Sequence, residues 1–96
     1  MTGAEVLITN EVGLHARPAV KLTKLAKTFA SRVELAVAAD GPWIDAKSIV
    51  KVMAAKARKG STLFLRAEGD DAAAALAALV GLVERDFDEG ASHAGG

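Results

Sequence analysis

The chain has 96 residues, 51% of them apolar, which is enough for one folded domain with a core and too few for two. It contains no cysteine, and this excludes a disulfide scaffold, a zinc–thiolate site and thiol redox chemistry. Its apolar runs are far shorter than the ~20 residues of a membrane span, and no secretion signal is visible. We therefore expect a cytoplasmic protein that does not insert into a membrane.

Charge is unevenly distributed along the chain. Residues 1–66 hold 11 basic and 5 acidic residues, whereas residues 67–96 hold 1 basic and 7 acidic residues, so the formal net charge is zero. The cationic first part favours an acidic partner surface. Nucleic acid is disfavoured, because the sequence has no Tyr, one Trp and three Phe, and none is interleaved with the basic residues as a base-stacking platform requires.

The hydrophobic pattern predicts the element order β-α-β-β-α-β-α. Alternating apolar residues predict strands over 4–9, 32–38, 43–44 and 62–68, and helical spacing predicts helices over 16–29, 46–56 and from 72 to about 87. Together they predict an α+β fold, a four-stranded sheet with the helices on one face. We expect residues 1–88 to form the domain and residues 89–96 to be a flexible tail.

The same pattern assigns strand side chains to one face of the sheet or the other. In the second predicted strand, the residues expected to face the helices are Val33, Leu35 and Val37. The residues expected on the uncovered face of the sheet are Glu34, Ala36, Phe64 and Arg66.

The helix ends carry side chains suited to capping. Asp45 is the expected N-cap of the second helix, and Asp70 or Asp71 is the expected N-cap of the third. Within the second helix, Val50 and Val52 are expected in the core.

His15 is the candidate reactive residue, because it is the last loop residue before the first predicted helix. Backbone amides near Ala16 and Arg17 would stabilise an anion there, since helix N-termini carry unpaired N–H groups and a partial positive charge. The Arg17 guanidinium is a planar fork that suits phosphate. Pro18 is tolerated in a first helical turn, and Gly13 allows the loop a conformation closed to other residues.

An imidazole at such a position could accept a phosphoryl group, because a large fraction of imidazole is unprotonated near neutral pH. The neighbouring sequence offers no carboxylate pair, metal cluster or water-activating base. We therefore expect a carrier of the group, with no cofactor and no metal, and not a hydrolase or other enzyme. The spacing alone leaves a second interpretation open, in which His15 is an ordinary cap or surface residue. His93 lies in the predicted tail, and we expect no role for it.

Two segments resemble the HPr family, the histidine phosphocarriers of the phosphoenolpyruvate-dependent sugar phosphotransferase system. The segment from Gly13 to Ala19 is similar to the active-site signature of that family, and the segment from Asp45 to Met53 is similar to its second signature. The resemblance continues through 59–61 and 67–71 and covers residues 3–87. It implies an HPr-like open-faced β-sandwich, with a four-stranded antiparallel sheet and three helices on one face.

The resemblance also implies the chemistry of the site. His15 would be phosphorylated on its Nδ1 (pros) nitrogen, Arg17 would assist the transfer, and the backbone at Ala16, Arg17 and Pro18 would hold the phosphate. Enzyme I would donate the phosphoryl group, derived from phosphoenolpyruvate, and IIA domains of sugar permeases would accept it.

A partner protein needs a docking surface around His15. The expected members lie on the first and second helices and are Ala16, Val20, Lys24, Lys47, Ser48, Ile49, Lys51 and Met53. We interpret Ile49 as a surface residue, although its spacing also fits the core. Ser48 has two interpretations: an ordinary serine that satisfies a helix amide, or, from the resemblance, a regulatory site for HPr kinase/phosphorylase.

Several points depart from the family or stay open. Lys51 stands where many members carry a small residue, and the chain runs several residues past the usual end, which puts a family contact from the C-terminal carboxylate to Arg17 in doubt. Trp43 is interpreted as a packing residue. The nitrogen-related branch of the same system would also keep His15, and a small non-catalytic binding module is the alternative from another class. We expect a monomer.

Overall fold

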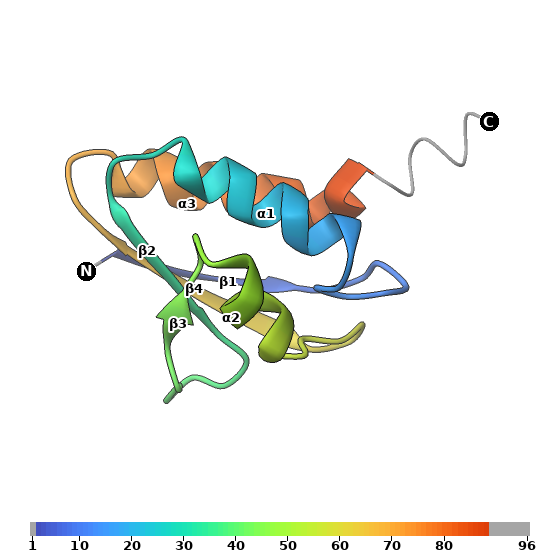
Figure 1. The fold of residues 1–96 in the computed structure, drawn as a ribbon. Helices are drawn as coiled ribbons and strands as arrows, with labels where there is room; N and C mark the ends of the chain where they lie inside the picture. Colours follow the sequence, from blue (N-terminus) through green and yellow to red (C-terminus); the bar gives the residue numbers. More distant parts are fainter. Residues whose placement is uncertain (1, 89–96) are drawn as a thin grey trace.

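The computed structural model describes residues 2–88, so the predicted tail 89–96 and His93 lie outside the described residues. The elements follow the predicted order, with one short 3-10 turn, η1, after the last helix (Figure 1). They are β1 (Thr2–Leu7), α1 (Arg17–Lys27), β2 (Arg32–Ala36), β3 (Ile44–Asp45), α2 (Ile49–Ala54), β4 (Thr62–Glu68), α3 (Ala72–Glu84) and η1 (Asp86–Asp88).

The four strands form one antiparallel sheet in the order β1-β4-β2-β3. The register pairs Val6 with Leu63 and Leu35 with Leu65, so the apolar positions of three strands share one face. Helices α1 and α3 lie side by side over that face, and α2 packs against α1 and β3 (Figure 1). The fold class expected from the sequence, an open-faced sandwich, is confirmed.

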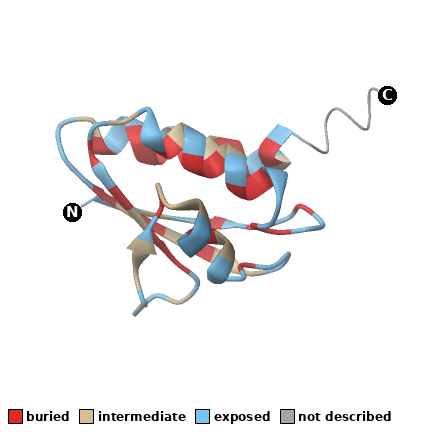
Figure 2. Cartoon of the chain, in the orientation of Figure 1, coloured by how far each residue is buried: buried red, intermediate tan, exposed pale blue. Residues whose placement is uncertain are grey.

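The core lies between the sheet and the two long helices, whose buried residues face the strands (Figure 2). Helix α3 packs on β1 and β4 through Ala75, Leu79 and Val83, each fully buried. Alanines on this helix let its backbone approach the strands closely. In the described part of the chain, no helix combines the length and apolarity needed to cross a membrane.

Two valines predicted to be buried are exposed. Val37 is 41% exposed because β2 ends at Ala36 and the chain has already turned away from the core. Val50 is 75% exposed, whereas Val52 is fully buried. Residues two apart on a helix point in nearly opposite directions, so Val50 faces solvent because Val52 faces the core.

The predicted N-cap of the second helix is also wrong. Asp45 ends β3, where it pairs with Glu34, and its Oδ1 accepts a hydrogen bond from the backbone N of Lys47 at 2.9 Å. Ser48 is the N-cap instead, since its Oγ accepts from the backbone N of Lys51 at 3.3 Å. Asp and Ser are equally good caps, so the sequence alone did not separate them.

Candidate functional site

His15 lies exposed in the loop between β1 and α1, and hydrogen bonds on both sides fix this loop. The buried Asn10 donates from Nδ2 to the carbonyl of Gly13 at 2.9 Å, and the N of Gly13 donates back to the carbonyl of Asn10 at 3.2 Å. The N of Leu14 donates to the carbonyl of Ala57 at 2.9 Å, and the Leu14 side chain is 1% exposed. The residue before His15 is therefore anchored in the core, while His15 itself projects outward.

Gly13 is required by both conformation and space. Its φ is 63°, and a Cβ placed there would lie 2.3 Å from the carbonyl oxygen of Ala57 and 2.9 Å from the Cα of Arg58. The close approach of the two backbones brings the chain after α2 beside His15. A salt bridge joins the same two loops, since Nζ of Lys59 lies 2.7 Å from Oε1 of Glu11. The hydrogen bond to Glu11 and its charge raise the pKa of the Lys59 ammonium.

Helix α1 begins immediately after His15. Ala16 is its N-cap and supplies the first carbonyl of the helix, which accepts from the N of Val20 at 3.2 Å. The backbone N–H groups of Arg17 and Ala19 precede that first helical bond, so they form the positive end of the helix next to His15. Pro18 has no N–H and is buried, so only its ring can contribute, by keeping the first turn rigid.

The backbone of Ala16 is strained. Its φ of 54° and ψ of −129° belong to a region that glycine occupies and that costs a residue with a Cβ roughly 1–3 kcal/mol. Such strain persists only where the surrounding contacts impose it, and here Leu14 on one side and Pro18 on the other are both buried. The strained residue lies directly between the reactive candidate and the helix amides.

A hollow of about 320 Å³ lies beside His15. The His15 loop lines it with Val12 and Leu14, and the end of α2 and the chain after it line it with Met53, Lys56, Ala57 and Arg58. Two of these side chains, Lys56 and Arg58, are exposed cations, and Val12 is 57% exposed. The surface next to His15 therefore combines apolar contact with positive charge.

The sequence analysis missed Val12, Lys56 and Arg58. Lys56 and Arg58 follow α2 and reach His15 through the Gly13–Ala57 contact, which has no signal in sequence periodicity. Val12 lies in the loop of His15 itself, three residues before the imidazole. The excess of basic residues before position 67 was the one available hint.

The predicted docking residues divide by position. Ala16, Arg17, Lys24 and Lys51 are exposed, Val20 is 39% exposed, and Ile49 and Met53 are half-buried against the core. Lys47 lies elsewhere: its Nζ donates to the carbonyl of Phe29 at 2.8 Å, just past the C-terminal end of α1, whereas His15 precedes the N-terminal end. This lysine therefore lies at the end of α1 that is remote from His15, away from the predicted docking surface.

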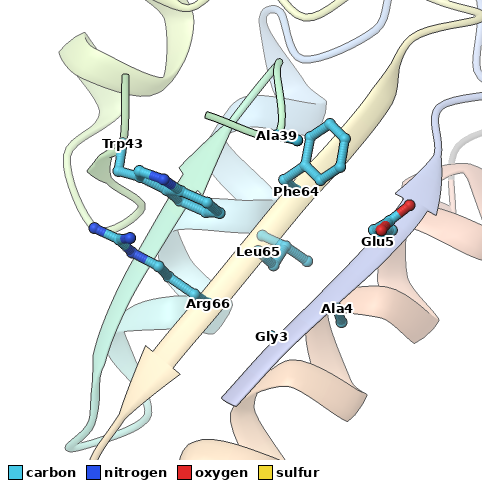
Figure 3. A pocket seen from close by; sticks show the side chains of 8 residues that line it. All are labelled: Gly3, Ala4, Glu5, Ala39, Trp43, Phe64, Leu65 and Arg66. Atoms are coloured by element: carbon cyan, nitrogen blue, oxygen red, sulfur yellow. The ribbon is translucent and has the colours of Figure 1, made fainter. Parts of the chain in front are cut away.

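The uncovered face of the sheet carries a second hollow, of about 580 Å³, between Trp43 and Phe64 (Figure 3). The Arg66 guanidinium lies 4.2 Å from the centre of the Trp43 ring, and its Nε donates to Oε1 of Glu34 at 2.7 Å. Ala36 is on this face as predicted but is only 1% exposed, because the connection carrying Trp43 lies over it. Trp43 therefore packs against Arg66, and the one carboxylate that lines this hollow is Glu5.

Comparisons with known proteins agree with this geometry. The family model described as "PTS HPr component phosphorylation site" matches residues 3–85. The phosphocarrier protein HPr of Cupriavidus necator is 42% identical over 90 residues, which cover 94% of this chain and 99% of that protein. The phosphocarrier protein NPr of Proteus mirabilis is 38% identical over 84 residues, covering 88% of this chain and 92% of that protein. Among solved structures, HPr-C-His from Thermoanaerobacter tengcongensis is similar with a TM-score of 0.86 and 38% identity, over 93% of this chain and 98% of that one.

Proposed function

The chain belongs to the HPr family, the phosphocarriers of the phosphotransferase system, and we propose that His15 is the residue on which it carries the phosphoryl group. A member of this family is a carrier and not an enzyme: it receives a group, holds it and passes it on. The observation that carries the proposal is the exposed imidazole at the N-terminal end of α1, where Arg17 and the first helix amides follow directly.

The transfer requires one bond to form as another breaks. The lone pair of the unprotonated Nδ1 of His15 attacks phosphorus, and the bond from phosphorus to the donor breaks with its electron pair returning to the donor. The backbone at Ala16 and Arg17 and the Arg17 guanidinium stabilise the phosphoryl oxygens. Pro18 keeps these groups in place. The reverse sequence, with the next protein as acceptor, unloads the carrier.

The proposed partners are Enzyme I as donor and IIA domains of sugar permeases as acceptors, and we propose that the protein acts in the cytoplasm and as a monomer. Lys56 and Arg58 are exposed and line the hollow beside His15, and Lys24 is exposed further along α1. They would meet acidic partner surfaces, and such complementarity chiefly speeds encounter and fixes orientation. Val20 and Met53 supply the apolar contacts of the same surface.

A loading assay tests the proposal. We expect phosphoenolpyruvate and Enzyme I to label the wild-type chain with one phosphoryl group that is labile to acid and stable to base, and His15→Ala to abolish the label while the fold is retained. Unchanged labelling of His15→Ala would overturn the assignment. Binding of partners that survives this substitution, with no labelling of the wild type, would instead identify a small binding module.

The position of Ser48 supports a second modification, by HPr kinase/phosphorylase. Its hydroxyl is half-buried at the N-cap of α2, and Ile49, Lys51 and Met53 follow it on the proposed docking surface. A phosphate there would add about −1.5 to −2 charges near pH 7 and would weaken binding to acidic partners.

Ser48→Asp imitates part of that charge. We expect this variant to be loaded by Enzyme I with a KM raised about three- to tenfold, as for the loss of about 0.6 to 1.4 kcal/mol of binding free energy. Ser48→Asn, which keeps an N-cap oxygen without the charge, is the matched control and should load as the wild type does. Equal KM values for the two variants would remove the electrostatic argument.

The similarity to an NPr protein keeps the nitrogen-related branch as the alternative. The two branches share the carrier chemistry and differ in the Enzyme I paralogue that serves as donor. Loading rates measured with the two paralogues side by side would assign the branch.

A further inference from the structure

The C-terminal end of the domain has a backbone that its residues do not favour. Asp86, Phe87 and Asp88, which we call the clasp, have φ values of 52°, 58° and 61°, three left-handed residues in a row without a glycine. Left-handed conformations are unfavourable for residues with a Cβ and normally occur singly. The contacts around the clasp must therefore impose this shape.

Two of those contacts hold the ends of the segment that carries His15. At one end, the hydroxyl of Thr9 donates to the carboxylate Oδ1 of Asp86. At the other end, Nζ of Lys21 in α1 donates to the carbonyl of Phe87 at 2.9 Å. Neighbouring residues of the clasp thus bind residue 9 and residue 21, on either side of His15.

The left-handed backbone lets Phe87 make two contacts at once, one through its side chain and one through its carbonyl oxygen. Its ring is fully buried as part of the core, in a turn that packs on α1 and α3, while its carbonyl oxygen accepts a hydrogen bond from the lysine of α1. Because the ring is fixed, the carbonyl and the neighbouring Asp86 carboxylate are fixed with it. The clasp therefore provides fixed hydrogen-bond acceptors for both ends of the His15 segment.

Contacts inside the segment extend this constraint to the imidazole. Asn10 follows Thr9 directly and forms the two bonds that hold Gly13. On the other side, Lys21 is one residue beyond Val20, whose N closes the first helical bond to Ala16. The strained Ala16, next to His15, lies between these two fixed points.

We infer that the clasp positions His15 for phosphoryl transfer, so that Thr9, Lys21 and Phe87 are positioning residues of the carrier site. The inference rests on the proposed function of His15. Small displacements of a reacting group reduce transfer rates steeply without changing how partners bind. Releasing one end of the segment should therefore lower the rate of transfer within the complex with Enzyme I and leave the affinity unchanged.

The test uses two variants that remove single contacts from the full-length chain. Thr9→Val deletes the hydroxyl donor at nearly constant shape, and Lys21→Met deletes the ammonium and keeps the length of the side chain. Phe87→Ala is avoided because the loss of a fully buried ring can unfold the domain. Thr28→Val is the matched control for the threonine, since the Thr28 hydroxyl donates locally to Leu25 at the far end of α1. Lys27→Met is the control for the lost charge.

We expect Thr9→Val and Lys21→Met each to lower kcat for loading by Enzyme I about five- to twentyfold with KM changed less than twofold. Thr9→Ser, which restores a hydroxyl, should recover most of the rate, and both control variants should load as the wild type does. Amide hydrogen exchange of residues 13–16, measured without any partner, should accelerate at least about fivefold in the two test variants and not in the controls.

Three results would overturn the inference. One is an unchanged kcat in Thr9→Val and Lys21→Met; another is a raised KM with kcat intact, which would assign these residues to docking. The third is a loss of rate that Lys27→Met or Thr28→Val reproduces. Failure of the proposed function is separate, because it would appear as labelling of His15→Ala or as no loading of the wild type.

Discussion

At the scale of single residues, the site depends on backbone positions that disfavour a side chain, Gly13 and Ala16, as well as on His15 itself. Gly13 brings the loop of His15 against the backbone at Ala57. No other residue fits there, because its φ is 63° and a Cβ would lie 2.3 Å from the carbonyl oxygen of Ala57. Ala16 takes a glycine-like conformation although it has a Cβ. The imidazole of His15 thus lies between Gly13, which no residue with a Cβ can replace without a clash, and Ala16, whose backbone is strained.

Gly13→Ala should therefore destabilise the domain by about 2–4 kcal/mol, from the left-handed conformation together with the clash against backbone atoms that cannot move away singly. Gly60→Ala is the control. Gly60 has a φ of 91°, yet a Cβ there would meet nothing within 4 Å, so only the conformational cost of about 1 kcal/mol applies. Urea unfolding of both variants measures the difference, and equal losses would show that the contact with Ala57 is unimportant.

At the scale of elements, Asp71 connects α3 to the turn between α1 and β2. It precedes α3 at the N-cap position, as one of the two predicted residues, but its side chain does not cap that helix. Its carboxylate accepts from the hydroxyl and N of Ser31 and from the N of Ala30. The hydrogen bond from the Ser31 hydroxyl, followed by that from Ala30, lowers the pKa of this carboxyl below its ordinary value of 3.8.

A lowered pKa in the folded state predicts the direction of the pH dependence. Asp71 stabilises the fold above pH 3.8, where the unfolded chain is also ionised, and this contribution is lost as the pH falls through the folded pKa. The stability difference between the wild type and Asp71→Asn should therefore shrink as the pH falls below 4, in urea unfolding followed at each pH. Asp70→Asn, at the exposed neighbouring position, should show no such convergence. A difference that stays constant down to pH 2 would contradict this role.

The elements themselves were largely predictable, because periodicity reports which face is buried. Strand β4 was predicted with its observed bounds, since Leu63, Leu65 and Ala67 alternate without interruption. The start of α2 was not, because Asp45 and Ser48 are both good caps and only the pairing of Asp45 with Glu34 in the sheet decides between them. The prediction for Val50 was wrong for a separate reason: residues two apart on a helix cannot both face the core, and Val52 is the one that does.

The site was predictable only where it is local in sequence. The loop from Gly13 to Pro18 carries its signals within six residues, so the exposed imidazole at a helix start could be expected. Lys56 and Arg58 join the site through contacts between distant loops, and the clasp has left-handed residues with the sequence Asp-Phe-Asp, which no turn rule anticipates. Such features follow from the packed domain and not from local preference.

At the scale of the whole molecule, the two ends of α1 differ: the N-terminal end lies at the candidate site, and the C-terminal end lies among structural hydrogen bonds. The N-terminal end carries His15 with its cations and apolar contacts, whereas the C-terminal end is joined to Lys47 through Phe29 and to Asp71 through Ala30. The core and the clasp both contact α1, so the fold supports the exposed imidazole of His15 at the N-terminal end of that helix. This arrangement would suit the proposed carrier, because the donor and the acceptor would meet the same exposed group in the same geometry.

The central claim is that one ring nitrogen carries the phosphoryl group, and NMR of the loaded chain tests it most directly. In a ¹⁵N-labelled chain phosphorylated by Enzyme I and phosphoenolpyruvate, we expect a single ³¹P coupling, to Nδ1 of His15, with the pattern of backbone signals otherwise retained away from residues 12–20 and 53–58. Phosphorus coupled to His93 or to Nε2 of His15, or found on Ser48 under these conditions, would contradict the account.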